Sequence, residues 1–109
     1  MLPKDDFSEG GVSPAKRHMD LVSKAGCVVG NRLPGSCAGR LELHHVAEGS
    51  GLRSDFAMVG LCYEHHQGQS GLHGMGTKGF IRLYRPPGES EYGLLVWVNE
   101  DIARLKVAA

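Results

Sequence analysis

The sequence predicts a small α+β domain that bound metal helps to stabilise, and three observations support this. The chain has 109 residues with 16 glycines and 5 prolines, so its helices and strands must be short and its core shallow. Eight cysteine and histidine side chains, all potential zinc ligands, occur between Cys27 and His73. The same stretch, about residues 27–73, has the order strand, loop, strand, helix. We therefore expect metal binding to add stability that apolar burial alone does not supply.

The N-terminal part is predicted to contain one helix after a mobile leader. Residues 1–12 are polar, contain glycine and lack hydrophobic periodicity, which is typical of a flexible segment. Ser13 and Pro14 follow as an N-cap and a first helical residue. The helix is expected to run to about Lys24, because Gly26 suits a C-terminal stop.

The middle of the chain is predicted to form two strands and a short helix. Residues 27–39 contain glycines and a proline, which favour a folded-back loop. Residues 40–46 alternate between polar and apolar side chains and indicate a strand. An exposed loop around residues 49–51 leads to a second strand over residues 57–61. One or two helical turns are expected over residues 63–70.

The C-terminal part is predicted to contain two strands and a short helix. Residues 74–79 are glycine-rich and indicate a flexible connector, after which residues 80–84 alternate as in a strand. Residues 93–98 are the most apolar strand candidate, and Asn99 is expected to cap a short terminal helix. Together with the N-terminal helix, these elements are expected to complete a single domain over residues 13–109.

Charge and hydropathy indicate a soluble protein whose middle could contact an anionic polymer. The formal net charge is zero, but basic residues predominate between residues 13 and 85, and acidic residues predominate at both ends. A basic middle is compatible with nucleic acid as partner. The longest apolar run, residues 94–98, is far shorter than the roughly 20 residues that a membrane span needs. Because the N-terminus has no apolar signal segment, we expect a cytoplasmic protein.

The cysteines are predicted to bind structural zinc. Three cysteines cannot all pair with one another, and nothing in the sequence indicates export to an oxidising compartment. Cys62 and His65 have the spacing of a chelating pair, and Cys27 and Cys37 can complete a tetrahedral site. Such a closed site has no open coordination position, so its role would be structural. The alternative is that Cys27 is a small core residue beside two valines.

The remaining histidines resemble the active site of the HNH, or ββα-metal, nuclease family. Leu43-His44-His45-Val46 is similar to that family's strand end, and the segment from Val59 to His66 is similar to its second strand and helix. The resemblance implies a zinc-stabilised ββα-metal core in which His44, His66 and His73 bind the catalytic ion. It also implies that His45 is the general base. The family's middle asparagine is absent, and Asp55 is the nearest polar side chain that could orient His45.

Within this family, residues 41–82 look most like the phage recombination enhancement branch. The segments His-His-Val-Ala-Glu-Gly-Ser-Gly-Leu-Arg and Gly-Leu-Cys-Tyr-Glu-His-His-Gln-Gly carry this resemblance. It implies a RecA-dependent DNA endonuclease that is encoded by a phage or prophage and acts in the cytoplasm of a bacterial host. DNA, and specifically DNA coated by a RecA filament, would be its substrate context.

The expected chemistry is metal-assisted hydrolysis of a phosphodiester bond. Three neutral histidines leave the full positive charge of a Mg²⁺, Mn²⁺ or Zn²⁺ ion available to polarise the phosphate, while His45 deprotonates the attacking water. Four basic side chains are candidates to hold flanking phosphates of the DNA: Arg40, Arg53, Lys78 and Arg82.

Two other functions use the same ligands. A zinc-stabilised module that binds DNA or protein without catalysis needs the structural site, and another metal-dependent hydrolase could use both sites. His45 separates the nuclease from the binding module, because a module without catalysis has no need for a histidine beside the ion that does not bind it. The eight donors divide into four structural ligands, three catalytic ligands and one base, as the nuclease requires.

Overall fold

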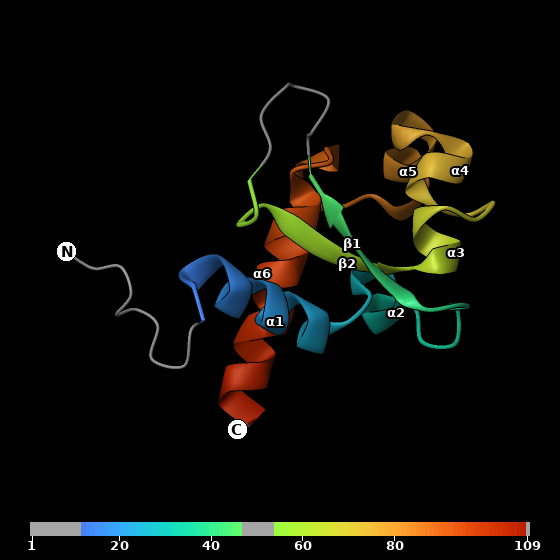
Figure 1. Cartoon of the computed structure of the whole chain (residues 1–109). Coiled ribbons are helices and arrows are strands. Elements are labelled where there is room, and N and C mark those ends of the chain that lie inside the picture. Colours follow the sequence, from blue (N-terminus) through green and yellow to red (C-terminus); the bar gives the residue numbers. More distant parts are fainter. Residues whose placement is uncertain (1–11, 47–53, 109) are drawn as a thin grey trace.

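The chain folds into a two-stranded antiparallel sheet surrounded by helices (Figure 1). The computed structural model describes residues 12–46 and 54–108. The elements in chain order are α1 (Pro14–Ala25), α2 (Val28–Arg32), β1 (Leu41–His45), β2 (Met58–Cys62), α3 (Tyr63–His66), α4 (Leu72–Met75), α5 (Thr77–Tyr84), the 3-10 helix η3 (Pro87–Glu89) and α6 (Gly93–Ala108). The predicted α+β class is confirmed. Except for Val12, the predicted leader and the loop at residues 49–51 lie outside the described residues.

Helix α1 forms where the capping residues predicted it. The Ser13 hydroxyl accepts a hydrogen bond from the backbone N–H of Lys16, and Pro14 is the first helical residue. Gly26 ends the helix with a φ of 81°, a conformation that side chains other than glycine rarely adopt. Val22 is the fully buried residue of its inner face.

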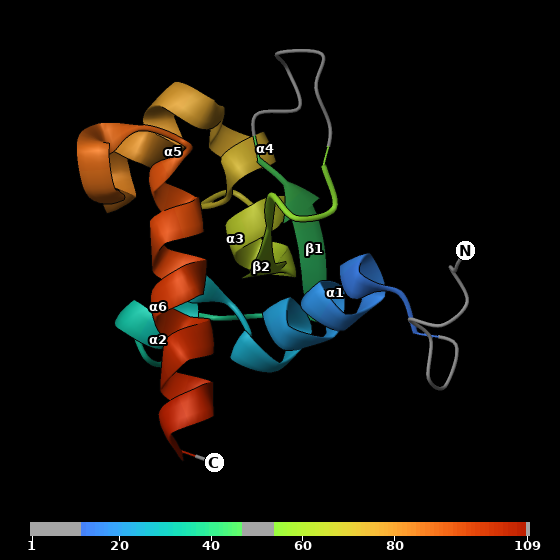
Figure 2. The ribbon, with the colours of Figure 1, turned by 90° about the vertical axis from the view of Figure 1, so that its left-hand side faces the viewer.

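The sheet pairs β1 with β2 in one register, from Leu41 opposite Cys62 to His45 opposite Met58. Both predicted strands are confirmed, with the second beginning and ending one residue later than expected. All of β2 is buried, because α1, α2, α3 and α6 contact it. Figure 2 shows α6 running beside the sheet past α1 and α2. The strand β1 is more exposed, and its side chains alternate between two faces.

The region of residues 27–39, predicted as a loop, contains the short helix α2. Cys27 caps this helix, since its Sγ accepts the backbone N–H of Gly30 at 3.3 Å. Its last residue, Arg32, anchors the helix to α6, since it pairs with Asp101 at 2.9 Å and lies over the ring of Trp97 at 4.8 Å. These contacts explain how so short a helix is stable.

The predicted connector and strand over residues 74–84 are wrong, because this region is helical. Helix α4 ends at Met75 and α5 begins at Thr77. Phe80 is fully buried, and its ring contacts that of Tyr84 four residues later, with centroids 4.8 Å apart. A spacing of four places both rings on one helical face, and this packing overrides the alternation that predicted a strand.

The predicted strand over residues 93–98 is also wrong, and Asn99 does not cap a helix. Both belong to α6. The buried side chains of Leu94, Val98 and Ile102 recur every four residues, so one apolar face continues through Asn99.

Candidate metal centres

Three cysteines and one histidine meet at the junction of four segments. Cys27 caps α2, Cys37 lies in the loop after it, Cys62 ends β2, and His65 belongs to α3. The three Sγ atoms lie 3.3, 3.9 and 3.2 Å from His65 Nδ1, in the order Cys27, Cys37, Cys62. All four ligand atoms lie within 4.8 Å of one another. We call this group the thiolate cluster. It consists of the four residues that were predicted to bind structural zinc.

The chemistry of the thiolate cluster fits a zinc ion. None of its cysteines forms a disulfide. The side chain of Cys37 is exposed, but desolvation of its sulfur, together with the neighbouring sulfurs of Cys62 and Cys27, raises the pKa of this thiol to about 12. Burial acts to raise the pKa of Cys62, but hydrogen bonds from the backbone of His65 and Ala38 lower it, so Cys37 is the thiol that keeps its proton unless a cation compensates the charge. Burial also lowers the pKa of His65, which favours the neutral, metal-binding imidazole. A set of three sulfurs and one nitrogen is a donor set that zinc prefers.

Gly30 makes room for the thiolate cluster, and the sequence analysis missed it. A Cβ atom at this position would collide with Cys37 Sγ. A residue with a side chain at position 30 would therefore push Cys37 away from Cys27 and His65. The sequence carried no signal for this role, because residues 27–39 were predicted as a loop, where glycine is common; the glycine is unusual only because α2 is a helix.

Three further histidines form a second group, which we call the histidine cluster: His44 of β1, His66 of α3 and His73 of α4. One ring nitrogen from each lies within 4.8 Å of the others. The ring centroids are 5.2 Å apart for His44 and His66, 5.5 Å for His44 and His73, and 4.7 Å for His66 and His73. These are the residues that the sequence analysis assigned to a catalytic ion.

Two glycines allow His73 to reach His66 across seven residues of sequence. A Cβ atom at Gly71 would collide with the backbone of α3, and one at Gly74 would collide with the carbonyl of Gly68. The chain therefore packs back closely on α3 and starts α4 beside it. As a result His73 stands next to His66.

The histidine cluster also fits a divalent cation. His66 Nε2 is buried and has no hydrogen-bond partner among the described residues, which is costly unless a ligand satisfies it. Burial lowers the pKa of His44 despite the opposing effect of Glu91, so its ring is held neutral. Three neutral imidazole nitrogens form a donor set that suits zinc and other divalent transition-metal ions and leaves coordination positions open.

Two carboxylates that the sequence analysis did not single out contact the histidine cluster. Glu91 Oε2 lies 2.9 Å from His44 Nε2, and Glu42 Oε1 lies 2.8 Å from His66 Nδ1. Hydrogen bonds from His66 and Gln67 lower the pKa of Glu42. Strand periodicity could have predicted the role of Glu42, which shares a face of β1 with His44.

His45 projects from β1 on the face opposite His44. Its Nε2 lies 3.0 Å from Asp55 Oδ1, so the structure pairs the predicted base with the residue predicted to orient it. The same alternation that places His44 in the histidine cluster leaves His45 outside it.

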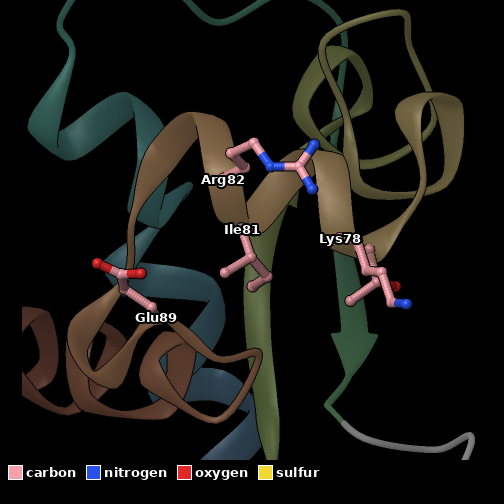
Figure 3. A pocket seen from close by; sticks show the side chains of 5 residues that line it. Lys78, Ile81, Arg82 and Glu89 are labelled. Atoms are coloured by element: carbon pink, nitrogen blue, oxygen red, sulfur yellow. The ribbon is translucent and has the colours of Figure 1, made fainter.

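The predicted DNA contacts lie in two places. Arg40 is exposed and pairs with Glu42 at 3.0 Å. Lys78 and Arg82 project from one side of α5 into a pocket of about 300 Å³, whose other lining residues are Thr77, Ile81 and Glu89 (Figure 3). Arg53 is outside the described residues.

No helix in the described ranges has the length and apolar character needed to cross a membrane.

Comparison with known proteins places the chain in a family. No curated protein and no solved structure matches the chain. Residues 12–102 match the family model described as recombination enhancement, RecA-dependent nuclease. The match includes both metal clusters, His45 and most of α6. The chain belongs to the family of recombination enhancement, RecA-dependent nucleases.

Proposed function

We propose that the protein is a metal-dependent DNA endonuclease of the HNH type that hydrolyses phosphodiester bonds in RecA-coated DNA. The family name supports nuclease activity, RecA dependence and a role in recombination. The consecutive elements β1, β2 and α3 support the ββα-metal arrangement. A phage or prophage gene expressed in the cytoplasm of a bacterial host would meet RecA filaments there.

One observation carries the proposal: neighbouring residues of β1 have different surroundings. His44 belongs to the histidine cluster, whereas His45 lies on the opposite face and contacts Asp55. A protein that only bound zinc would need neither the second cluster nor His45. The donors instead divide into a closed thiolate cluster, an open histidine cluster and one histidine outside both.

The residues take distinct roles in hydrolysis. His44, His66 and His73 would hold a Mg²⁺, Mn²⁺ or Zn²⁺ ion, whose positive charge would serve to polarise the scissile phosphate and stabilise the leaving oxygen. Asp55 accepts a hydrogen bond from His45 Nε2 and fixes the orientation of the ring. His45 then accepts the proton of the attacking water. The thiolate cluster, with zinc bound, holds α3 in place.

Basic side chains bind the DNA on either side of the cut. Arg40 lies two residues from Glu42 and four from His44, at the start of β1. Lys78 and Arg82 follow the histidine cluster along the chain, on α5. Arg40, Lys78 and Arg82 are proposed to contact backbone phosphates, and Arg53 stays a prediction from the sequence.

The test is cleavage of single-stranded DNA, naked and coated with RecA, in the presence of Mg²⁺, Mn²⁺ or Zn²⁺. We expect the wild-type protein to cut RecA-coated DNA. His45→Ala should keep its fold and both metals but cut about 10²–10⁴ times more slowly, the usual effect of losing a general base. His18→Ala is the matched control, because His18 belongs to neither cluster, and it should cut normally.

A zinc-stabilised binding module gives a different result. It would bind DNA without cutting it, and His45→Ala would change nothing measurable. Cleavage at the wild-type rate by His45→Ala, or loss of a metal equivalent in that variant, would refute the assignment of His45 as the base.

A further inference from the structure

Two of the three rings in the histidine cluster are each held by a carboxylate from another part of the chain. Glu91 contacts His44 at 2.9 Å, and Glu42 contacts His66 at 2.8 Å. The side chains are shielded from solvent, with exposed fractions of 4% for His44, 20% for Glu91, 11% for His66 and 12% for Glu42. Carboxylates so shielded are costly unless they are paired, which indicates a specific role.

The contacts determine which nitrogen of each ring can bind a cation. A neutral imidazole carries one proton, and a carboxylate accepts a hydrogen bond from the nitrogen that carries it. Glu42 therefore places the proton of His66 on Nδ1 and leaves the lone pair on Nε2. That Nε2 is the buried nitrogen without a partner among the described residues. The same reasoning places the proton of His44 on Nε2, beside Glu91, and its lone pair on Nδ1.

The fold makes further contacts to both glutamates, through the side chain of Glu42 and through the backbone of Glu91. Glu42 also accepts a hydrogen bond from Gln67 at 2.9 Å and pairs with Arg40 at 3.0 Å. Glu91 lies between η3 and α6. Its backbone carbonyl accepts a hydrogen bond from the backbone N–H of Leu94 at 3.0 Å. The chain there is closely packed, because a Cβ atom at Gly93 would collide with Pro87. The fold therefore fixes the side chain of Glu42 and the backbone of Glu91.

We propose that Glu42 and Glu91 are positioning residues that orient His66 and His44 for binding a divalent cation. The proposal rests on the proposed function only in that the histidine cluster binds such a cation. Three neutral imidazoles bring no charge to a divalent ion. Two carboxylates one ring further away strengthen the imidazoles as ligands and balance part of its charge. Glu91 thereby makes the connection between η3 and α6 part of the metal centre, 47 residues along the chain from His44.

The experiment measures Mn²⁺ binding by calorimetry on protein that retains its zinc. Mn²⁺ suits the test because thiolates do not favour it, so it should leave the thiolate cluster unchanged. We expect Glu91→Ala and Glu42→Ala to bind Mn²⁺ about 10–100 times more weakly than the wild type. Glu91→Gln should lose less, since its amide oxygen can accept the same hydrogen bond. Zinc content and thermal unfolding should not change.

The controls separate a positioning role from direct ligation and from a general loss of negative charge. Glu100→Gln changes an exposed carboxylate of α6 that pairs with Arg32, and it should bind Mn²⁺ like the wild type. Wild-type affinity in Glu91→Ala and Glu42→Ala overturns the proposal. A loss in Glu91→Gln as complete as in His44→Ala also overturns it, because Glu91 would then be a ligand itself.

The outcome is independent of catalysis. A wild-type protein that binds Mn²⁺ through these residues but cuts no DNA refutes the proposed function and leaves the positioning role intact. A wild-type protein that binds no Mn²⁺ at the histidine cluster overturns the positioning role.

Discussion

His65 and His66 are neighbours in the chain but belong to different clusters. His65 is buried among three sulfurs, and His66 faces two other histidines. One turn of α3 directs them apart, since successive residues of a helix point about 100° from each other. Two substitutions one residue apart should therefore have different effects.

We expect His66→Ala to retain its fold and its zinc but to lose the second metal equivalent. His65→Ala should lose zinc and much of its stability, because a structural site with three ligands binds zinc weakly. The measurement is metal content of the purified variants, together with thermal unfolding. Equal destabilisation by both substitutions would mean that the two clusters are not separate.

The metal ligands could be predicted from the sequence, and strand periodicity could also indicate Glu42, whereas Glu91 could not be predicted. Cysteine and histidine are uncommon and bind metals by virtue of their own chemistry, so eight of them close together are informative. Glutamate is common on every surface. Only the fold brings Glu91 to His44, and no spacing in the sequence marks that contact.

At the level of elements, a substitution in α2 tests whether Cys37 binds zinc, because the stability of the variant should rise without zinc binding and fall with it. Gly30→Ala should favour the helix by up to about 1 kcal/mol if nothing fixes Cys37, because alanine is the better helix former. If zinc holds Cys37 Sγ in place, the added methyl group collides with it and the variant should bind zinc more weakly and unfold at a lower temperature. We expect the second result, measured by zinc competition and thermal unfolding. A variant more stable than the wild type would contradict zinc binding by Cys37.

The packing of α2 against α6 should depend on the carboxylate of Asp101. Asp101 is 3% exposed and contacts Asn31, Arg32 and Arg104. Burial acts to raise the pKa of Asp101, but the hydrogen bonds from Arg32 and Asn31 outweigh it and hold the pKa below its usual value. Asp101→Asn should lower the free energy of unfolding by about 3 kcal/mol. This is near the lower end of the range for breaking a buried ion pair, because Arg32 is partly exposed.

The pH dependence of that difference follows from the direction of the shift. A carboxyl with a lowered pKa stabilises the fold fully above its unfolded pKa of about 3.9 and loses this contribution as the pH falls through the folded value. The free energy of unfolding of wild type minus that of Asp101→Asn should therefore stay constant from pH 8 to pH 5. Urea denaturation at several pH values measures it, and a difference that shrinks above pH 5 would contradict the assignment.

Elements with local signals were predicted, and those determined by packing were not. Ser13, Pro14 and Gly26 act within one turn of α1, so the sequence alone shows where this helix begins and ends. Residues 80–84 alternate over only five positions and residues 93–98 form a short apolar run, and both patterns fit a strand and a helix equally well. Packing of Phe80 against Tyr84, and of Val98 into the core, decided in favour of helices.

At the scale of the whole molecule, metal binding and the packing of the core should depend on each other. Cys27 and Cys62 belong to the buried apolar cluster as well as to the thiolate cluster. Removal of zinc would leave thiols and an imidazole in the core without their ligand. We expect a strong chelator to abolish the cooperative thermal transition, followed by circular dichroism. A metal-free protein that still melts cooperatively would show that burial alone suffices.

The exposed position of Cys37 connects this chemistry to the oxidation state of the cell. Oxidants attack accessible sulfur first, and Cys37 is the exposed member of the thiolate cluster. Oxidised sulfur would release zinc, and α3, a helix of four residues that also contacts β1, β2 and α4, would shift when His65 loses the ion. His66 would move with it, so peroxide should stop DNA cleavage at a centre that contains no sulfur. Zinc release and loss of cleavage should follow the same time course, and reductant with fresh zinc should restore both. A nuclease built in this way would be switched off in a cell under oxidative stress.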